Sequence, residues 1–337
     1  MRQLVNIIVL FLIVQFGGIL IAIYTTPALL YYVQSGSMQV NSFEGALMYV
    51  IYIIAVTAVL LVIFRFYRKP KLFTLMEAMV VLLSTGFILF SILATAFPGA
   101  NPTYIFLCAA AVTIALIIAK NLRPRLRNLL AITSSIGVGV IIGSNGFYLA
   151  YFLMLLISLY DYIAVFVTKH MVTMAKEMST RNLAFLIGST DVEAVPQRYL
   201  SKADVSEYRK QEPKSKDPLT KRLMRSGVFP VVSQVQLGSG DLALPLMLAT
   251  SAYISFLSYS AAMMVIAGSA AGMIFTMYLL KRYKVALPAI PPLFAFCNLS
   301  LGIFFAINST QSYSLWLGFF AVFIVTIAVL LNKLRNG

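Results

Sequence analysis

The chain has 337 residues, of which 60% are hydrophobic and 11% are charged, and its mean hydropathy is +0.89. No soluble domain of this length is so apolar, so the composition predicts a polytopic helical membrane protein. The net charge of +15 would suggest a nucleic-acid ligand in a soluble protein, but here the basic residues fall in loops between apolar runs, which argues against nucleic-acid binding.

Ten apolar runs have about the length that a membrane-spanning helix needs. We expect these spans at approximately 5–31, 46–64, 75–97, 103–119, 129–143, 147–168, 238–256, 260–280, 287–307 and 313–332. The first run is too long for the apolar core of a signal peptide and precedes no small-residue cleavage site, so we interpret it as a retained helix. The expected fold is an all-α polytopic membrane bundle.

Lysine and arginine alternate between the loops without exception. They occur at both ends of the chain and in the loops after the second, fourth, sixth and eighth spans. The intervening loops contain none: 34–44, 98–102, 144–146, 257–259 and 308–312. By the positive-inside rule, the N-terminus, the 169–226 loop and the C-terminus are predicted to be cytoplasmic.

The longest hydrophilic segment divides the chain into three parts. Residues 1–168 form an N-terminal six-helix half, 169–226 a basic and largely mobile loop, and 227–337 a C-terminal half. Residues 169–187 are apolar enough to extend the sixth helix or to lie at the interface. The β-branched stretch from Val231 to Leu237 predicts an extended edge, to which an unwound substrate can add a strand.

Only two of the 11 acidic residues fall deep inside apolar runs, Asp161 in the sixth span and Asp241 in the seventh. A membrane carboxylate is costly and marks a functional site by default. Asp161 lies about seven residues, ~10 Å, from the cytoplasmic end of its span, and Asp241 lies within a turn or two of the same surface. We therefore expect the two carboxyl groups to face each other.

Such a pair is suited to acid–base hydrolysis. Two carboxyl groups a few ångströms apart cannot both ionise cheaply, so they share one proton and titrate as a unit. One activates a water molecule while the other polarises a scissile carbonyl. Gly238 and Gly240 are expected to permit unusual backbone or close approach, and the prolines between 288 and 292 to leave irregular backbone beside a wet cavity.

The remaining residue types exclude other kinds of catalytic site. His170 is the only histidine, and Cys108 and Cys297 form no CxxC pair. The chain therefore has neither an HExxH zinc motif nor a serine–histidine dyad in the membrane. We expect no metal and no cofactor.

Three motifs together resemble the presenilin and signal peptide peptidase family of intramembrane aspartyl proteases. Tyr160-Asp161 matches the family's YD motif, and Gly238-Ser239-Gly240-Asp241 matches its GxGD motif. Pro288-Ala289-Ile290, followed by Pro291, matches the PAL motif with isoleucine in place of leucine. Their order and their separation by one long loop make the combination specific over about 145–292. An archaeal presenilin-like enzyme is the nearest resemblance.

The resemblance implies a bundle of nine core transmembrane helices in which Asp161 and Asp241 are the catalytic pair. It also implies a set of residues that shape the site or bind substrate: Tyr160, Gly238, Ser239, Gly240, Pro288, Ala289, Ile290 and Pro291. The implied activity is endoproteolysis within transmembrane segments or remnant signal peptides, in a multi-pass protein of a prokaryotic cell membrane. The implied partners are substrate helices and lipid, without obligatory partner subunits.

One feature departs from the family pattern, and one alternative function stays open. The family has nine helices and an external C-terminus, whereas 313–332 predicts a tenth helix that returns the chain to the inside. The alternative is a proton- or ion-coupled secondary transporter in which the two aspartates relay protons. The six-and-four division of spans around the loop disfavours a transporter built from symmetric repeats.

Overall fold

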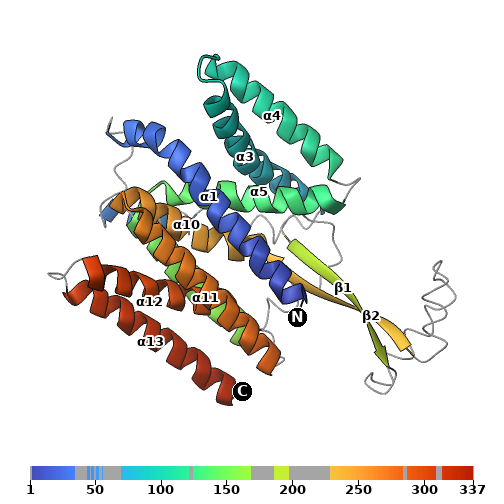
Figure 1. Cartoon of the computed structure of the whole chain (residues 1–337), viewed down its shortest axis with the longest axis vertical. Coiled ribbons are helices and arrows are strands. Elements are labelled where there is room, and N and C mark those ends of the chain that lie inside the picture. Colours follow the sequence, from blue (N-terminus) through green and yellow to red (C-terminus); the bar gives the residue numbers. More distant parts are fainter. Residues whose placement is uncertain are drawn as a thin grey trace. The chain divides into compact units, whose positions relative to one another are not determined.

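The computed structural model of the chain describes residues 2–34, 70–120, 124–167, 186–196, 228–283, 287–308 and 313–336, with a few positions between 44 and 55. These ranges contain nine long helices and two strands (Figure 1). The helices are α1 (Arg2–Gln34), α3 (Pro70–Ala96), α4 (Pro102–Ala119), α5 (Pro124–Gly143), α6 (Phe147–Phe166), α10 (Ser239–Phe256), α11 (Tyr259–Tyr283), α12 (Ile290–Asn308) and α13 (Tyr313–Asn336). Most of the predicted span at 46–64 and most of the 169–226 loop lie outside the described residues.

The described helices confirm the predicted membrane bundle. Eight of the nine are long and apolar enough to cross a bilayer, including α13, the additional helix expected near the end of the chain. The ninth, α10, carries Asp241 and Pro245, and 11 of its 18 residues are buried. A helix that is buried on nearly all sides has to be enclosed by its neighbours.

Helix α10 packs against α5, α11 and α6. Two glycines of α5 allow the close approach: a Cβ on Gly139 would lie 2.9 Å from the Leu246 side chain, and one on Gly143 would lie 2.5 Å from the Met247 carbonyl oxygen. The two glycines bring the backbone of α5 against the helix that carries Asp241.

A buried ion pair joins α3 and α4. The Lys120 ammonium lies 2.6 Å from a carboxylate oxygen of Glu77, and both side chains are buried. Lys120 is the first basic residue after the fourth predicted span. The residue caps the C-terminal end of α4 and turns toward α3, where the carboxylate offsets its charge.

A two-stranded sheet belongs to a compact unit that contains Met1–Ile7 and Gly188–Leu237, while the rest of the chain forms a second unit. Its strands are β1 (Leu186–Pro196) and β2 (Val228–Gly238). Strand β2 confirms the extended conformation predicted from Val231 onward. Strand β1 was not predicted, because its partner lies more than 30 residues later in the sequence and neither strand satisfies its backbone groups alone.

Candidate active site

Asp161 lies on α6, five residues before the helix ends, and its side chain is buried with 5% of its surface exposed. Its Oδ2 accepts a hydrogen bond from the backbone N–H of Ile290, with a donor–acceptor distance of 3.1 Å. Ile290 is the first residue of α12, where backbone N–H groups lack helical partners. The start of α12 therefore provides a donor for the carboxylate and a favourable dipole.

The proline-rich start of α12 is irregular over a shorter stretch than the sequence suggested. Residues 287–289 are not helical, but Pro291 and Pro292 lie within the first turn of α12. Proline is tolerated there because N–H groups in the first turn have no intrahelical acceptor. The non-helical segment ends at the residue whose N–H reaches Asp161.

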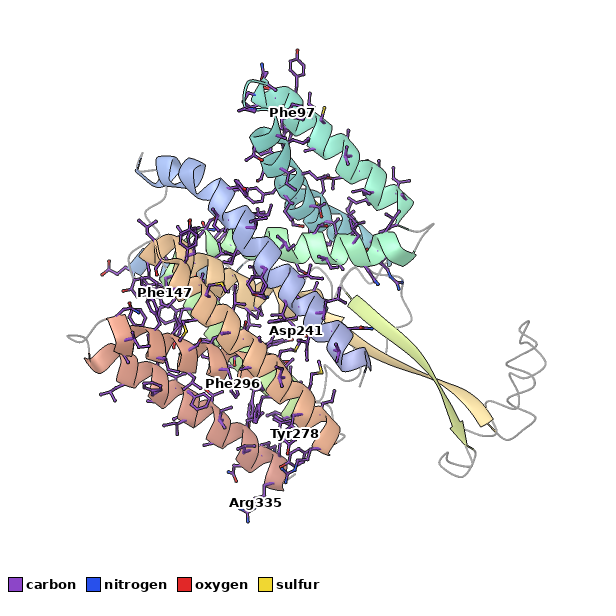
Figure 2. The ribbon with its side chains drawn as sticks, in the orientation of Figure 1. Phe97, Phe147, Asp241, Tyr278, Phe296 and Arg335 are labelled. Atoms are coloured by element: carbon purple, nitrogen blue, oxygen red, sulfur yellow. The ribbon has the colours of Figure 1, made fainter. Side chains whose placement is uncertain are left out.

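Asp241, which is labelled in Figure 2, occupies the first turn of α10 and is partly exposed. Its carboxylate accepts a hydrogen bond from the backbone of Gly238, the residue that precedes α10. The carboxyl groups of Asp161 and Asp241 also lie close enough to interact electrostatically. Two acids that are 80 positions apart in the sequence are thus brought together from α6 and α10, each beside the N-terminus of a helix.

The other predicted site residues occupy different places. Pro288, Ile290 and Pro291 are buried at the start of α12, with Ala289 partly exposed between them. Tyr160 is 59% exposed, so its ring lies on the surface of the bundle and not beside the buried carboxylate.

The two glycines before Asp241 do not adopt the unusual backbone that was expected of them. Gly238 has ordinary extended backbone (φ −67°, ψ 141°), and a Cβ there would make a normal contact 3.4 Å from the Asp241 carboxylate. Among the residues that the structure describes, a Cβ on Gly240 would meet nothing within 4 Å. Neither strained backbone nor close packing therefore requires glycine. What Gly240 leaves is open space beside the acid.

Two side chains that the sequence analysis did not single out hold the start of α10. Gln15 of α1 is fully buried and donates from Nε2 to the Leu242 carbonyl oxygen at 3.0 Å. Ser135 of α5 donates to the Ser239 carbonyl oxygen at 3.2 Å. The signal for Gln15 was available, because it is the only amide between residues 7 and 33 of the first span, and polar side chains there mark interhelical hydrogen bonds.

A second polar contact links the helices around Asp161. The Tyr151 hydroxyl of α6 lies 2.7 Å from Asn298 Oδ1 of α12, and Asn298 donates its amide to the Phe294 carbonyl oxygen. Helices α6 and α12 are thus joined by two hydrogen bonds, one at the carboxylate and one ten residues earlier on α6. Among the described residues, no group of three or more His, Cys, Asp or Glu side chains is placed to hold a metal ion.

Comparisons with known proteins agree with this arrangement. The sequence model of the family described as signal-peptide peptidase, presenilin aspartyl protease matches residues 8–307. The solved structure of a presenilin family intramembrane aspartate protease is similar in fold, with a TM-score of 0.57 and 19% sequence identity, covering 90% of this chain and 99% of that one. Among proteins with curated descriptions, none matches.

Proposed function

Since the chain belongs to the signal-peptide peptidase, presenilin aspartyl protease family, it is an intramembrane aspartic protease, and we propose that Asp161 and Asp241 are its catalytic pair. The observation that carries the assignment is that these two acids, from α6 and α10, interact inside a bundle of apolar helices. The comparisons do not support the alternative of a proton- or ion-coupled transporter.

The two carboxyl groups act as one unit that holds a single proton. The ionised member takes a proton from a water molecule, whose oxygen attacks the scissile carbonyl carbon. The protonated member gives its proton to the carbonyl oxygen. When the tetrahedral intermediate collapses, the proton taken from water passes to the departing amide nitrogen, and the hydroxyl proton returns to the other carboxylate. The N–H groups of Ile290 and Gly238 hold the two carboxylates in place.

The open space at Gly240 supports a substrate-binding role for this segment. A peptide bond is accessible to water only where the substrate helix is unwound, and an extended substrate backbone fits beside a residue without a side chain. Strand β2 ends at Gly238, the residue directly before α10, and an extended substrate segment can pair with the edge of such a strand. The proposed substrates are transmembrane segments and remnant signal peptides.

The alternation of basic loops supports a cytoplasmic location for both termini and the 169–226 loop, in a prokaryotic cell membrane. We also propose that the protein cleaves without partner subunits, because both acids and the groups that hold them come from one chain. Protease accessibility of the 169–226 loop in inside-out and right-side-out vesicles tests the cytoplasmic location. Activity of the purified single chain in detergent tests the independence from partner subunits.

The test of the catalytic pair uses purified protein and a single-span reporter substrate, with fragment masses as the readout. Wild type is expected to produce fragments, whereas Asp161→Ala and Asp241→Ala produce none and unfold at the wild-type temperature or above it, since each removes a charge from the membrane interior. Asp191→Ala, which changes an acid in β1, is the matched control and should cleave normally. Cleavage by either active-site variant at the wild-type rate would overturn the assignment.

A further inference from the structure

Helix α13 lies beyond the part of the chain that matches the family, which ends at residue 307. It runs along α12, as Figure 1 shows. Its buried residues are Phe319, Leu330 and Leu334, whose spacing of 11 and 4 places them on one face of the helix. Ile324 and Val325, which are 62% and 61% exposed, lie on the surface.

Near its start, α13 packs on the polar link between α6 and α12. The Phe319 ring lies 5.7 Å from the Tyr151 ring, edge to face, and is stacked on Phe305 of α12 at 5.6 Å. Tyr151 is the residue whose hydroxyl bonds to Asn298. One turn later, Phe323 meets Phe296, which is labelled in Figure 2. These contacts fix α13 against both helices at once.

Near its end, α13 packs on the segments that flank the carboxylate. Leu330 and Leu334 form a cluster with Leu279 of α11, and Phe166 and Leu287 pack against it. Phe166 is the last residue of α6, five positions after Asp161. Leu287 lies in the non-helical stretch 287–289, directly before Ile290, the donor to Asp161. The cluster therefore contacts the two segments that carry this hydrogen bond, at Phe166 after Asp161 and at Leu287 before Ile290.

We propose that α13 is a clamp that holds α6 and α12 in register, with Leu330 and Leu334 as positioning residues that keep the Ile290 N–H against the Asp161 carboxylate. The inference rests on the catalytic role proposed for Asp161. The clamp is needed because residues 287–289 have no helical hydrogen bonds to fix them, so packing has to do so. Lipid tails are as apolar as leucine but cannot supply a fixed shape, so lipid is a poor substitute for α13.

The test compares Leu330→Ala/Leu334→Ala with Ile324→Ala/Val325→Ala, which removes similar volume from the lipid-facing surface of the same helix. Turnover is measured per active site, counted by titration with a tight-binding transition-state analogue, so loss of folded protein does not count as loss of catalysis. We expect kcat of the inner variant to fall about tenfold or more, with KM changed by less than about twofold, because catalytic groups tolerate little misplacement. The outer variant should match wild type, and Leu330→Met/Leu334→Met should recover most of the loss.

A second readout addresses the mechanism directly. Backbone amide hydrogen exchange over 287–296 should accelerate in the inner variant and not in the outer one. Wild-type turnover per titrated site in the inner variant would overturn the clamp while leaving the catalytic pair untouched, whereas cleavage by Asp161→Ala would overturn the proposed function itself. If the double variant does not fold, Leu330→Val and Leu334→Val are measured in the same way, and wild-type kcat in both would equally refute the clamp.

Discussion

Replacing Gln15 with leucine is expected to leave the helix bundle as stable as before, or more stable, and to slow cleavage. The variant loses the hydrogen bond from Gln15 Nε2 to the Leu242 carbonyl. An interhelical hydrogen bond in a membrane contributes about 0.6 kcal/mol on average. The variant also loses the Gln15 Oε1 atom, which is buried and has no hydrogen-bond partner among the described residues. A buried unsatisfied polar atom costs about 1–3 kcal/mol, so the balance favours the variant by roughly 1 kcal/mol.

Activity should respond in the opposite direction. Leu242 directly follows Asp241, and Pro245 removes the N–H that would otherwise bond to the Asp241 carbonyl in a regular helix. Among the described residues, the contact from Gln15 is one of two side-chain hydrogen bonds from other helices to the first turn of α10. Without it the carboxylate is held less firmly, and we expect kcat to fall by about tenfold, since an ångström of misplacement is sufficient for such a loss.

The assay pairs thermal unfolding of the purified variant in detergent with kcat on the single-span reporter. Phe16→Leu, at the neighbouring position of α1, is the control because its side chain is 49% exposed and should affect neither quantity. A variant of Gln15 that unfolds at a lower temperature and cleaves at the wild-type rate would show that the amide serves the stability of the bundle, and the reasoning above would be wrong.

Three further variants test separate parts of the structure. Gly240→Ala should unfold no earlier than wild type, because alanine loses less backbone entropy on folding than glycine, by about 0.4–1 kcal/mol where the native conformation suits both residues. Its KM should rise because the methyl group enters the open space, and an unchanged KM would count against a substrate there. Ile290→Pro removes the N–H donor to Asp161. A hydrogen bond to a charged group contributes about 1.5–3 kcal/mol, so kcat should fall by about ten- to a hundredfold, whereas Ile290→Val keeps the donor and should leave kcat unchanged. Glu77→Ala leaves the buried Lys120 ammonium without this carboxylate and should cost about 3–5 kcal/mol of stability. Glu77→Leu/Lys120→Met removes both charges and should be nearly neutral. Thermal unfolding measures both variants, and an equal loss of stability in the two would refute the pairing argument.

The membrane helices could be predicted from the sequence because apolar length is a local property. The predicted start of α10 at 238 and the structural start at Ser239 differ by one residue. The pairing of Asp161 and Asp241 could also be anticipated, because both acids lie at a similar depth on either side of the same loop. The depth of a residue below the membrane surface follows from its distance to the end of the helix and the rise per residue.

What could not be predicted depends on contacts between distant segments. Strand β1 needs a partner that begins at Val228, and the burial of Lys120 depends on a carboxylate 43 positions earlier. Gly240 shows a different limit, since the unusual backbone expected there is not found and the structure has open space beside the acid instead. The glycine avoids filling space and does not relieve a crowded or strained backbone.

The helix that carries Asp241 is also the one that is least able to face lipid. Among the described helices, only α10 is not apolar enough to qualify as a membrane span, because its short length includes a carboxylate, a proline and several hydroxyl groups. Its polar groups therefore depend on the other helices, and the contacts from Gln15 and Ser135 supply part of what water would supply elsewhere. Apolar packing encloses α10, but apolar contacts alone do not fix how far the helix is shifted or rotated against its neighbours. The position of its first turn therefore has to come from these few hydrogen bonds and from close glycine contacts. It follows that substitutions at such contacts should alter catalysis more than stability, whereas substitutions on the lipid-facing surfaces should alter neither.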